Sequence, residues 1–148
     1  MEADSPPRLP RPTKPRCGVH VPSVLRCALM IFAVKTALKA YGFGRTLRWI
    51  RRRIEGVPML EEVHVDAVTA TEFAVAMAGA LYPGRALCLE QSLVLYYLLC
   101  RGGVPVELRL GVQPHPFLAH AWVQYQGQPI NDVPEHVKRF APLPDTSL

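Results

Sequence analysis

Three residues of this 148-residue chain have the types and the order of a thiol-dependent catalytic site. Cys88 opens the apolar segment "CLEQSLVLYYLLC", and His120 and Asp132 follow it in the chain. A thiol nucleophile requires a base within hydrogen-bond reach and a third group that orients this base. Histidine and aspartate suit these two roles, so the pattern indicates nucleophilic catalysis by Cys88.

The position of Cys88 at the start of a predicted helix favours a reactive thiol. A helix N-terminus has free N–H groups and a partial positive charge, which stabilise a thiolate. The same N–H groups can bind the oxyanion of a tetrahedral intermediate. Cys100 lies at the far end of this helix, where no such field helps it, and we interpret it as a core residue. The alternative interpretation of Cys88 is a small hydrophobic residue at a helix end.

A predicted hairpin brings His120 and Asp132 together. If Tyr125-Gln126-Gly127 forms a three-residue loop with its glycine in the left-handed conformation, Gln124 faces Gln128 and His120 faces Asp132. Directly opposed residues have Cβ atoms about 4.5–5.5 Å apart. An isolated histidine on a strand more often has a structural role. The carboxylate opposite His120 is the feature that favours a catalytic role for this histidine. A register slip of one residue would move Asp132 to the other face of the hairpin.

Helical segments are predicted in the first half of the chain. Ser23 can cap a helix whose apolar residues recur at three-four spacing, and Gly42 interrupts it before a short helix that reaches Ile54. Thr69 and Glu72 form a capping-box pattern, which predicts the start of the next helix. This helix carries an apolar stripe made of Phe73, Met77, Ala80 and Leu81.

The helix that Cys88 opens is predicted to be central. Between Cys88 and Cys100 apolar residues cover nearly its whole circumference, which is typical of a buried helix. After Gly102-Gly103 the apolar period changes to two, which predicts a half-buried strand over 104–112. The segments "LAHAWVQY" and "QPIND" predict two further strands. Helices followed by a small antiparallel sheet indicate an α+β fold with the sheet packed on the central helix.

Composition and charge restrict the class of protein. Hydrophobic content of 49% and charged content of 20% are ordinary for a globular domain. The net charge of +5 is concentrated in the first third, which is compatible with nucleic acid, an acidic peptide or a membrane surface as partner but more often marks a solvated face. The apolar run Cys27–Val34 is shorter than the roughly 20 residues of a membrane span. Because its helical period continues, we favour a structural helix over a secretion signal.

Cysteine and histidine spacing argues against a disulfide scaffold or a zinc site. No CxxC pair occurs, and His64, His115 and His136 lack the spacing of metal ligands. We therefore predict a cytoplasmic protein that binds neither a metal nor another cofactor, and no nucleic acid. Residues 1–22, rich in proline and basic residues, predict a disordered tail. Residues 23–148 predict a single domain, with N-terminal helices over 23–64 and a catalytic core over 65–140.

The motifs around Cys88, His120 and Asp132 resemble those of a known family. "CLEQSLVLYYLLCRGG", "LRLGV" and "AHAWV", followed by the aspartate, are similar to the B protein of lasso-peptide biosynthesis, a leader peptidase of the transglutaminase-like cysteine protease superfamily. The resemblance covers roughly Val65 to Asp132. It implies a papain-like, transglutaminase-like core in which Cys88 is the nucleophile, His120 the base and acid, and Asp132 the orienting carboxylate.

The same resemblance implies a bacterial cysteine endopeptidase that removes the leader from a ribosomally made lasso-peptide precursor before macrocyclisation. Its implied partners are the precursor leader, a separate leader-recognition protein and an asparagine-synthetase-like cyclase. We expect the stand-alone protease form, because no strand-rich stretch precedes Val65. The alternatives are transglutaminase-type acyl transfer to an amine and a non-catalytic scaffold of the maturation complex. Docking of a partner on the Arg51–Arg53 run is a further hypothesis.

Overall fold

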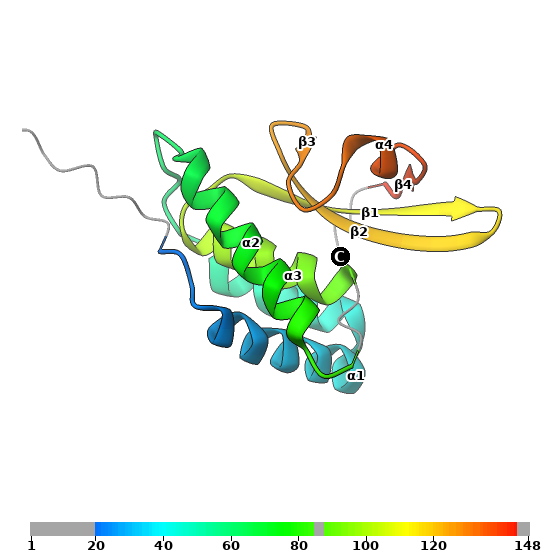
Figure 1. Ribbon diagram of the computed structural model, residues 1–148, viewed down its shortest axis with the longest axis horizontal. Coiled ribbons are helices and arrows are strands. Elements are labelled where there is room, and N and C mark those ends of the chain that lie inside the picture. The colour runs from blue at the N-terminus through cyan, green and yellow to red at the C-terminus, as the bar shows by residue number, and fades with distance from the viewer. Residues whose placement is uncertain (1–19, 85–87, 145–148) are drawn as a thin grey trace, which may run out of the picture.

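The computed structural model describes residues 20–84 and 88–144, which form a layer of helices on one side of a curled antiparallel sheet (Figure 1). The sheet has the strand order β3-β2-β1-β4. This arrangement confirms the predicted α+β fold, whereas the predicted tail lies almost wholly outside the described residues. The elements are α1 (Val24–Ile54), α2 (Val65–Leu81), α3 (Cys88–Arg101), β1 (Val106–Pro114), β2 (Phe117–Tyr125), β3 (Gln128–Pro129), α4 (Pro134–Val137) and β4 (Ala141–Pro142).

Helix α3 lies at the centre of the fold, as its apolar circumference predicts. It contacts α1 and α2 on one side and strands β1 and β2 on the other. Leu93, Val94, Leu95 and Leu99 are almost completely buried, and each such side chain contributes about 1.5–3 kcal/mol of transfer free energy. This packing fixes the amino end of α3, where Cys88 lies, relative to the sheet.

Helix α1 bends sharply at Gly42, where the sequence predicts an interruption. Gly42 has φ 76° and ψ 172°, a conformation that residues with a side chain rarely adopt and that glycine adopts readily. The Thr46 hydroxyl donates a hydrogen bond to the Gly42 carbonyl at 2.9 Å, so this side chain binds the backbone at the bend. At the amino end the Ser23 side chain accepts from the Arg26 N–H, which confirms the predicted cap. The bend divides α1 into two arms.

Helix α2 differs from its prediction at its start and in the face that it buries. It begins at Val65, one turn before the capping-box residue Thr69, because Val68 is buried and extends the packed face. Phe73 and Leu81 of the apolar stripe are 62% and 68% exposed. The buried face instead lies on another side of the helix and contains several small residues, which let neighbouring helices approach closely: Val68, Thr71, Ala74, Val75, Ala78 and Gly79. No helix in the described ranges combines the length and the hydropathy needed to cross a bilayer.

Candidate active site

His120 lies on β2 within a group of aromatic rings. In the ladder between β1 and β2 it is opposite Gly111. A Cβ at Gly111 would lie 2.8 Å from the Phe140 Cβ and 3.0 Å from the Trp122 ring, so only glycine leaves room for both neighbours. The His120 ring centroid is 5.0 Å from that of Phe140 and 6.0 Å from that of Trp122. These contacts restrict the orientation of the imidazole.

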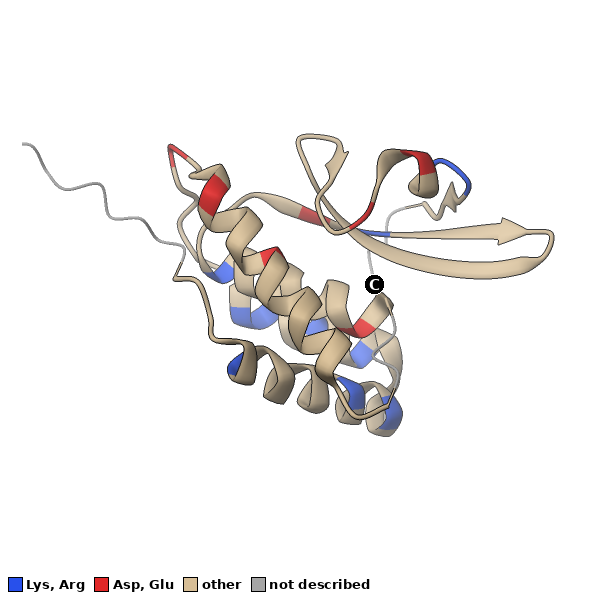
Figure 2. Ribbon diagram, in the orientation of Figure 1, with Lys and Arg blue, Asp and Glu red and all other residues tan. Residues whose placement is uncertain are grey.

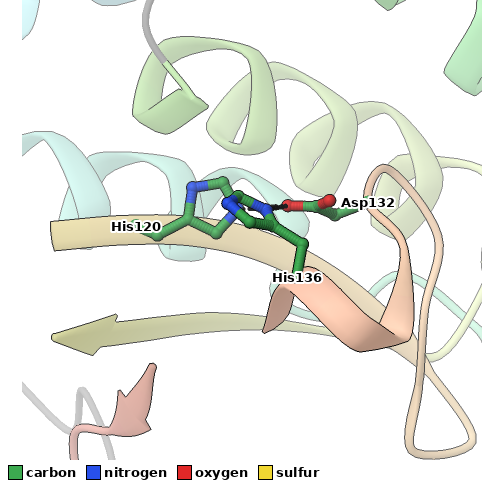
Figure 3. A group of neighbouring side chains, drawn as sticks. All are labelled: His120, Asp132 and His136. Atoms are coloured by element: carbon green, nitrogen blue, oxygen red, sulfur yellow. Dashed lines mark hydrogen bonds and ion pairs between the residues drawn. The ribbon is translucent and has the colours of Figure 1, made fainter. Parts of the chain in front are cut away.

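Asp132 contacts the imidazole of His120 directly (Figure 3). The Asp132 Oδ2 atom lies 2.5 Å from the His120 Nε2 atom, and both side chains are largely buried. A carboxylate in this position accepts the Nε2–H and leaves the other ring nitrogen, Nδ1, to act as a base. The structure therefore brings together the histidine and the aspartate that the sequence singles out.

The route by which Asp132 reaches this position differs from the predicted one. Gln126 and Gly127, with φ of 49° and 78°, form a two-residue loop, and Tyr125 pairs with Gln128. The predicted three-residue loop is wrong, and the register differs by one residue. If the ladder continued, Asp132 would lie on the wrong face of the hairpin. Strand β3 instead ends at Pro129, so the register does not control the position of Asp132.

The side chain of Asn131 turns the chain away from the ladder. Its Oδ1 accepts from the Val123 N–H at 2.8 Å, and its Nδ2 donates to the Ser92 Oγ at 2.9 Å. Ser92 is fully buried, and its hydroxyl donates to the Ala121 carbonyl at 2.9 Å. This network joins α3, β2 and the segment after β3, and it places the next residue, Asp132, beside the imidazole.

Asp132 also accepts hydrogen bonds from two other groups. The His136 Nδ1 atom lies 2.7 Å from the same Oδ2 atom, and the Val133 N–H donates to Oδ1 at 2.7 Å. Burial of Asp132 opposes its ionisation, but the hydrogen bonds from His136, the Val133 N–H and His120 outweigh it and hold the pKa of Asp132 below its usual range. The carboxylate is thus kept ionised, as a group that supports an imidazolium must be.

His120, Asp132 and His136 form a set of donors that could bind a metal ion. Their ligand atoms lie within 4.8 Å of one another. Ligands at about 2.0–2.2 Å from a tetrahedral ion are roughly 3.3 Å apart, whereas the nitrogen–oxygen separations here are 2.5 Å and 2.7 Å. These are hydrogen-bond distances, and the side chains would have to separate to admit an ion. The geometry therefore favours a hydrogen-bonded group of side chains over a metal site.

Cys88 and His120 line the same cavity. Cys88 is the first residue of α3 and is half-buried. The cavity has a volume of about 210 Å³, and its other lining residues are mainly apolar, with Phe43, Gly111 and Leu143 among them. Phe43 comes directly after the bend of α1, so the bend directs this ring into the cavity. A substrate carbonyl could therefore meet both the thiol and the imidazole here.

The other described cysteines differ from Cys88 in their surroundings. Cys27 and Cys100 are buried in the core. Burial raises the pKa of the Cys100 thiol to about 11, although hydrogen bonds with Val106 and Tyr96 partly offset it. Burial likewise raises the pKa of the Cys27 thiol. These findings agree with the interpretation of Cys100 as a core residue.

Sequence reasoning did not include His136 or Asn131 in the site. His136 is four residues after Asp132, and such spacing brings side chains together when the segment is helical. Short helix α4 supplies that geometry. Asn131 had no comparable signal, because its partner Ser92 is 39 residues away in the chain. The contacts of these two side chains with Asp132 and Ser92 are visible only in the folded chain.

Comparisons with known proteins agree with this fold. A 47-residue stretch is 40% identical to the microcin J25-processing protein McjB of Escherichia coli. This stretch covers 32% of this chain and 23% of McjB. The matched stretch therefore spans less than a quarter of the relative. No solved structure matches the chain. Residues 30–145 match the transglutaminase-like superfamily. Because this match extends over far more than half of the chain, the protein belongs to the transglutaminase-like superfamily.

Proposed function

We propose that the protein is a cysteine endopeptidase that removes the leader from a ribosomally made lasso-peptide precursor before macrocyclisation. The observation that carries the proposal is the cavity shared by Cys88 and His120, with Asp132 hydrogen-bonded to the imidazole. The partial identity with McjB, whose name describes processing of microcin J25, supports a peptide precursor as substrate. The proposed setting is the bacterial cytoplasm.

The proposed reaction proceeds through an acyl-enzyme. The Cys88 thiolate attacks the scissile carbonyl carbon, and backbone N–H groups at the start of α3 bind the oxyanion. The His120 imidazolium then protonates the leaving amine as the carbon–nitrogen bond breaks. His120 next takes a proton from water, which attacks the thioester and releases the acid and the thiolate. Asp132 orients His120 and stabilises its charged form throughout.

The proposed partners are the precursor leader, a separate leader-recognition protein and an asparagine-synthetase-like cyclase. The three-residue site occupies the core that we assign to residues 65–140, and the helices of residues 23–64 contribute Phe43 to the cavity wall. The recognition protein would present the leader to the cavity, and the cyclase would consume the released peptide.

Mass spectrometry of a precursor incubated with the recognition protein and this chain tests the proposal. We expect the wild-type chain to cut the leader and Cys88→Ala to abolish cleavage. Cys100→Ala is the matched control, because it removes the same atom from a core position and should retain activity. Cleavage that persists in Cys88→Ala would overturn the assignment of the nucleophile.

Two further measurements separate the alternative functions. If a primary amine added to the reaction is incorporated as an amide in place of hydrolysis, the protein is an acyltransferase. A scaffold would not require a reactive thiol, so the rates of alkylation by iodoacetamide at neutral pH are informative. We expect Cys88 to react much faster than Cys100, whose buried thiol has a pKa of about 11. Equal rates would favour the scaffold.

A further inference from the structure

Helix α1 carries an apolar groove that the proposed catalytic site does not use. Two cavities, of about 460 Å³ and 280 Å³, lie along it. Both are lined by Ala33, Val34 and Trp49 of α1, so they meet in one groove along this helix, and Val94 and Tyr97 of α3 complete the wall of the smaller cavity. Trp49 is 52% exposed despite its position between the cavities. A half-exposed tryptophan in an apolar groove is typical of a binding surface.

The dimensions of the groove suit a peptide segment. Arg26 lines one cavity, and Tyr41 and Arg45 line the other near the bend. At 1.5 Å per helical residue, the first arm extends about 22 Å from Arg26 to Tyr41, which corresponds to roughly four helical turns. Ala33 and Ala37 are one turn apart on this arm, and such small side chains let a partner backbone approach closely. Helix-in-groove recognition uses surfaces of this kind.

The charge of α1 indicates the chemistry of the occupant. Figure 2 shows basic residues along both arms and no acidic residue on this helix. Arg26 and Arg45 lie in the lining of the two cavities, and the Arg53 guanidinium carbon lies 4.7 Å from the centroid of the Trp49 ring. The ion pairs found in the described parts of the chain involve no arginine of α1. The basic residues of α1 are Arg26, Lys35, Lys39, Arg45, Arg48, Arg51, Arg52 and Arg53.

We propose that this groove docks an acidic, amphipathic peptide segment of a partner protein. Apolar side chains of the segment would fill the two cavities around Trp49, and its carboxylates would pair with Arg26 and Arg45. The chain's own N-terminal sequence is a poor occupant because it is also basic, and a second copy would set one basic helix against another. A flat anionic membrane would contact the arginines but leave the concave cavities unfilled.

The position of the groove relates it to the cavity that contains Cys88. Tyr41 and Arg45 line the groove, whereas Phe43, between them in the chain, lines the other cavity. The bend of α1 therefore separates the two surfaces. A segment docked with one end at the bend would hold the chain that follows it close to Cys88. The docking itself does not depend on the proposed peptidase activity.

Fluorescence anisotropy with the full-length chain tests the proposal. The probe is a fluorescein-labelled 16-residue synthetic peptide with leucine on one helical face and glutamate on the other, and its counterpart has lysine in place of every glutamate. We expect micromolar binding of the acidic peptide, weakened by salt, and no binding of the basic one. Emission of Trp49 should shift to shorter wavelength on binding, while Trp122 is buried and should not respond.

A pair of variants locates the binding surface. Ala33→Glu places a negative charge in the groove, and Thr36→Glu places the same charge one turn away, on an exposed position that lines neither cavity. We expect Ala33→Glu to weaken binding about tenfold or more, and Thr36→Glu to weaken it less than about threefold. Circular dichroism of both exposed variants establishes that they are folded.

Three outcomes would overturn the proposal. The first is equal binding of the acidic and basic peptides, and the second is equal weakening by the two variants. The third is co-sedimentation with phosphatidylcholine–phosphatidylglycerol vesicles that is lost in Ala33→Glu, without any binding of the acidic peptide. That result would assign the groove to a membrane surface. Selective binding of the acidic peptide that only Ala33→Glu weakens would establish the docking site.

Discussion

Substitution of Ser92 by alanine tests whether the buried network supports the site. Ser92 is completely buried, donates to the Ala121 carbonyl and accepts from the Asn131 amide. Ser92→Ala removes only the hydroxyl, so both partners lose a hydrogen bond where water does not easily replace it. Each buried polar group left without a partner costs about 1–3 kcal/mol. Two such groups would cost about 2–6 kcal/mol. Because Asn131 is only half-buried, we expect the free energy of unfolding to fall by an amount in the lower part of this range, about 2–4 kcal/mol.

Urea unfolding followed by circular dichroism measures this loss. The matched control is Thr36→Ala, which removes a hydroxyl that donates to the Phe32 carbonyl on an exposed face of α1. Because solvent can replace that bond and alanine is the better helix former, the control should remain within about 0.5 kcal/mol of the wild type or gain slightly. A Ser92→Ala variant as stable as this control would refute the reasoning, since it would show that the network contributes nothing.

Two further predictions concern Asp132 and Gly111. The pKa of Asp132 is lowered in the folded chain, so the stability that it contributes is present above the ordinary value of about 3.9 and is lost as the pH falls through the lower folded value. Urea unfolding between pH 6 and pH 2 should therefore show a smaller acid-induced decline in Asp132→Asn than in the wild type, and equal declines would contradict this cause. Gly111→Ala should cost about 1–3 kcal/mol, because the new Cβ would lie 2.8 Å from the Phe140 Cβ, and a thermal unfolding scan should show the lower midpoint. An unchanged midpoint would contradict this reasoning, because it would mean that Phe140 and Trp122 move aside without any loss of stability.

Much of the site could be predicted because its signals are local. The apolar circumference of α3 and the glycine pair after it are contained in one short stretch, and the structure has this helix at Cys88–Arg101. The alternation that predicts the first two strands is equally local, and both are present. The exposure of the apolar stripe on α2 could not be predicted from such local signals. The face that a helix buries depends on its neighbours, and here the small residues allow the closer packing.

The sequence by itself determined which groups are available for chemistry. It supplied a cysteine at a helix start, a histidine on a strand and an aspartate downstream, together with the hairpin that joins the last two. Only the tertiary structure decided how Asp132 reaches His120. The register is set by a two-residue loop that no propensity singled out, and the departure from the ladder is set by the hydrogen bond between Asn131 and Ser92. The physical reason is that this bond joins residues far apart in the chain, and local sequence patterns predict only contacts between residues that are near one another in the chain.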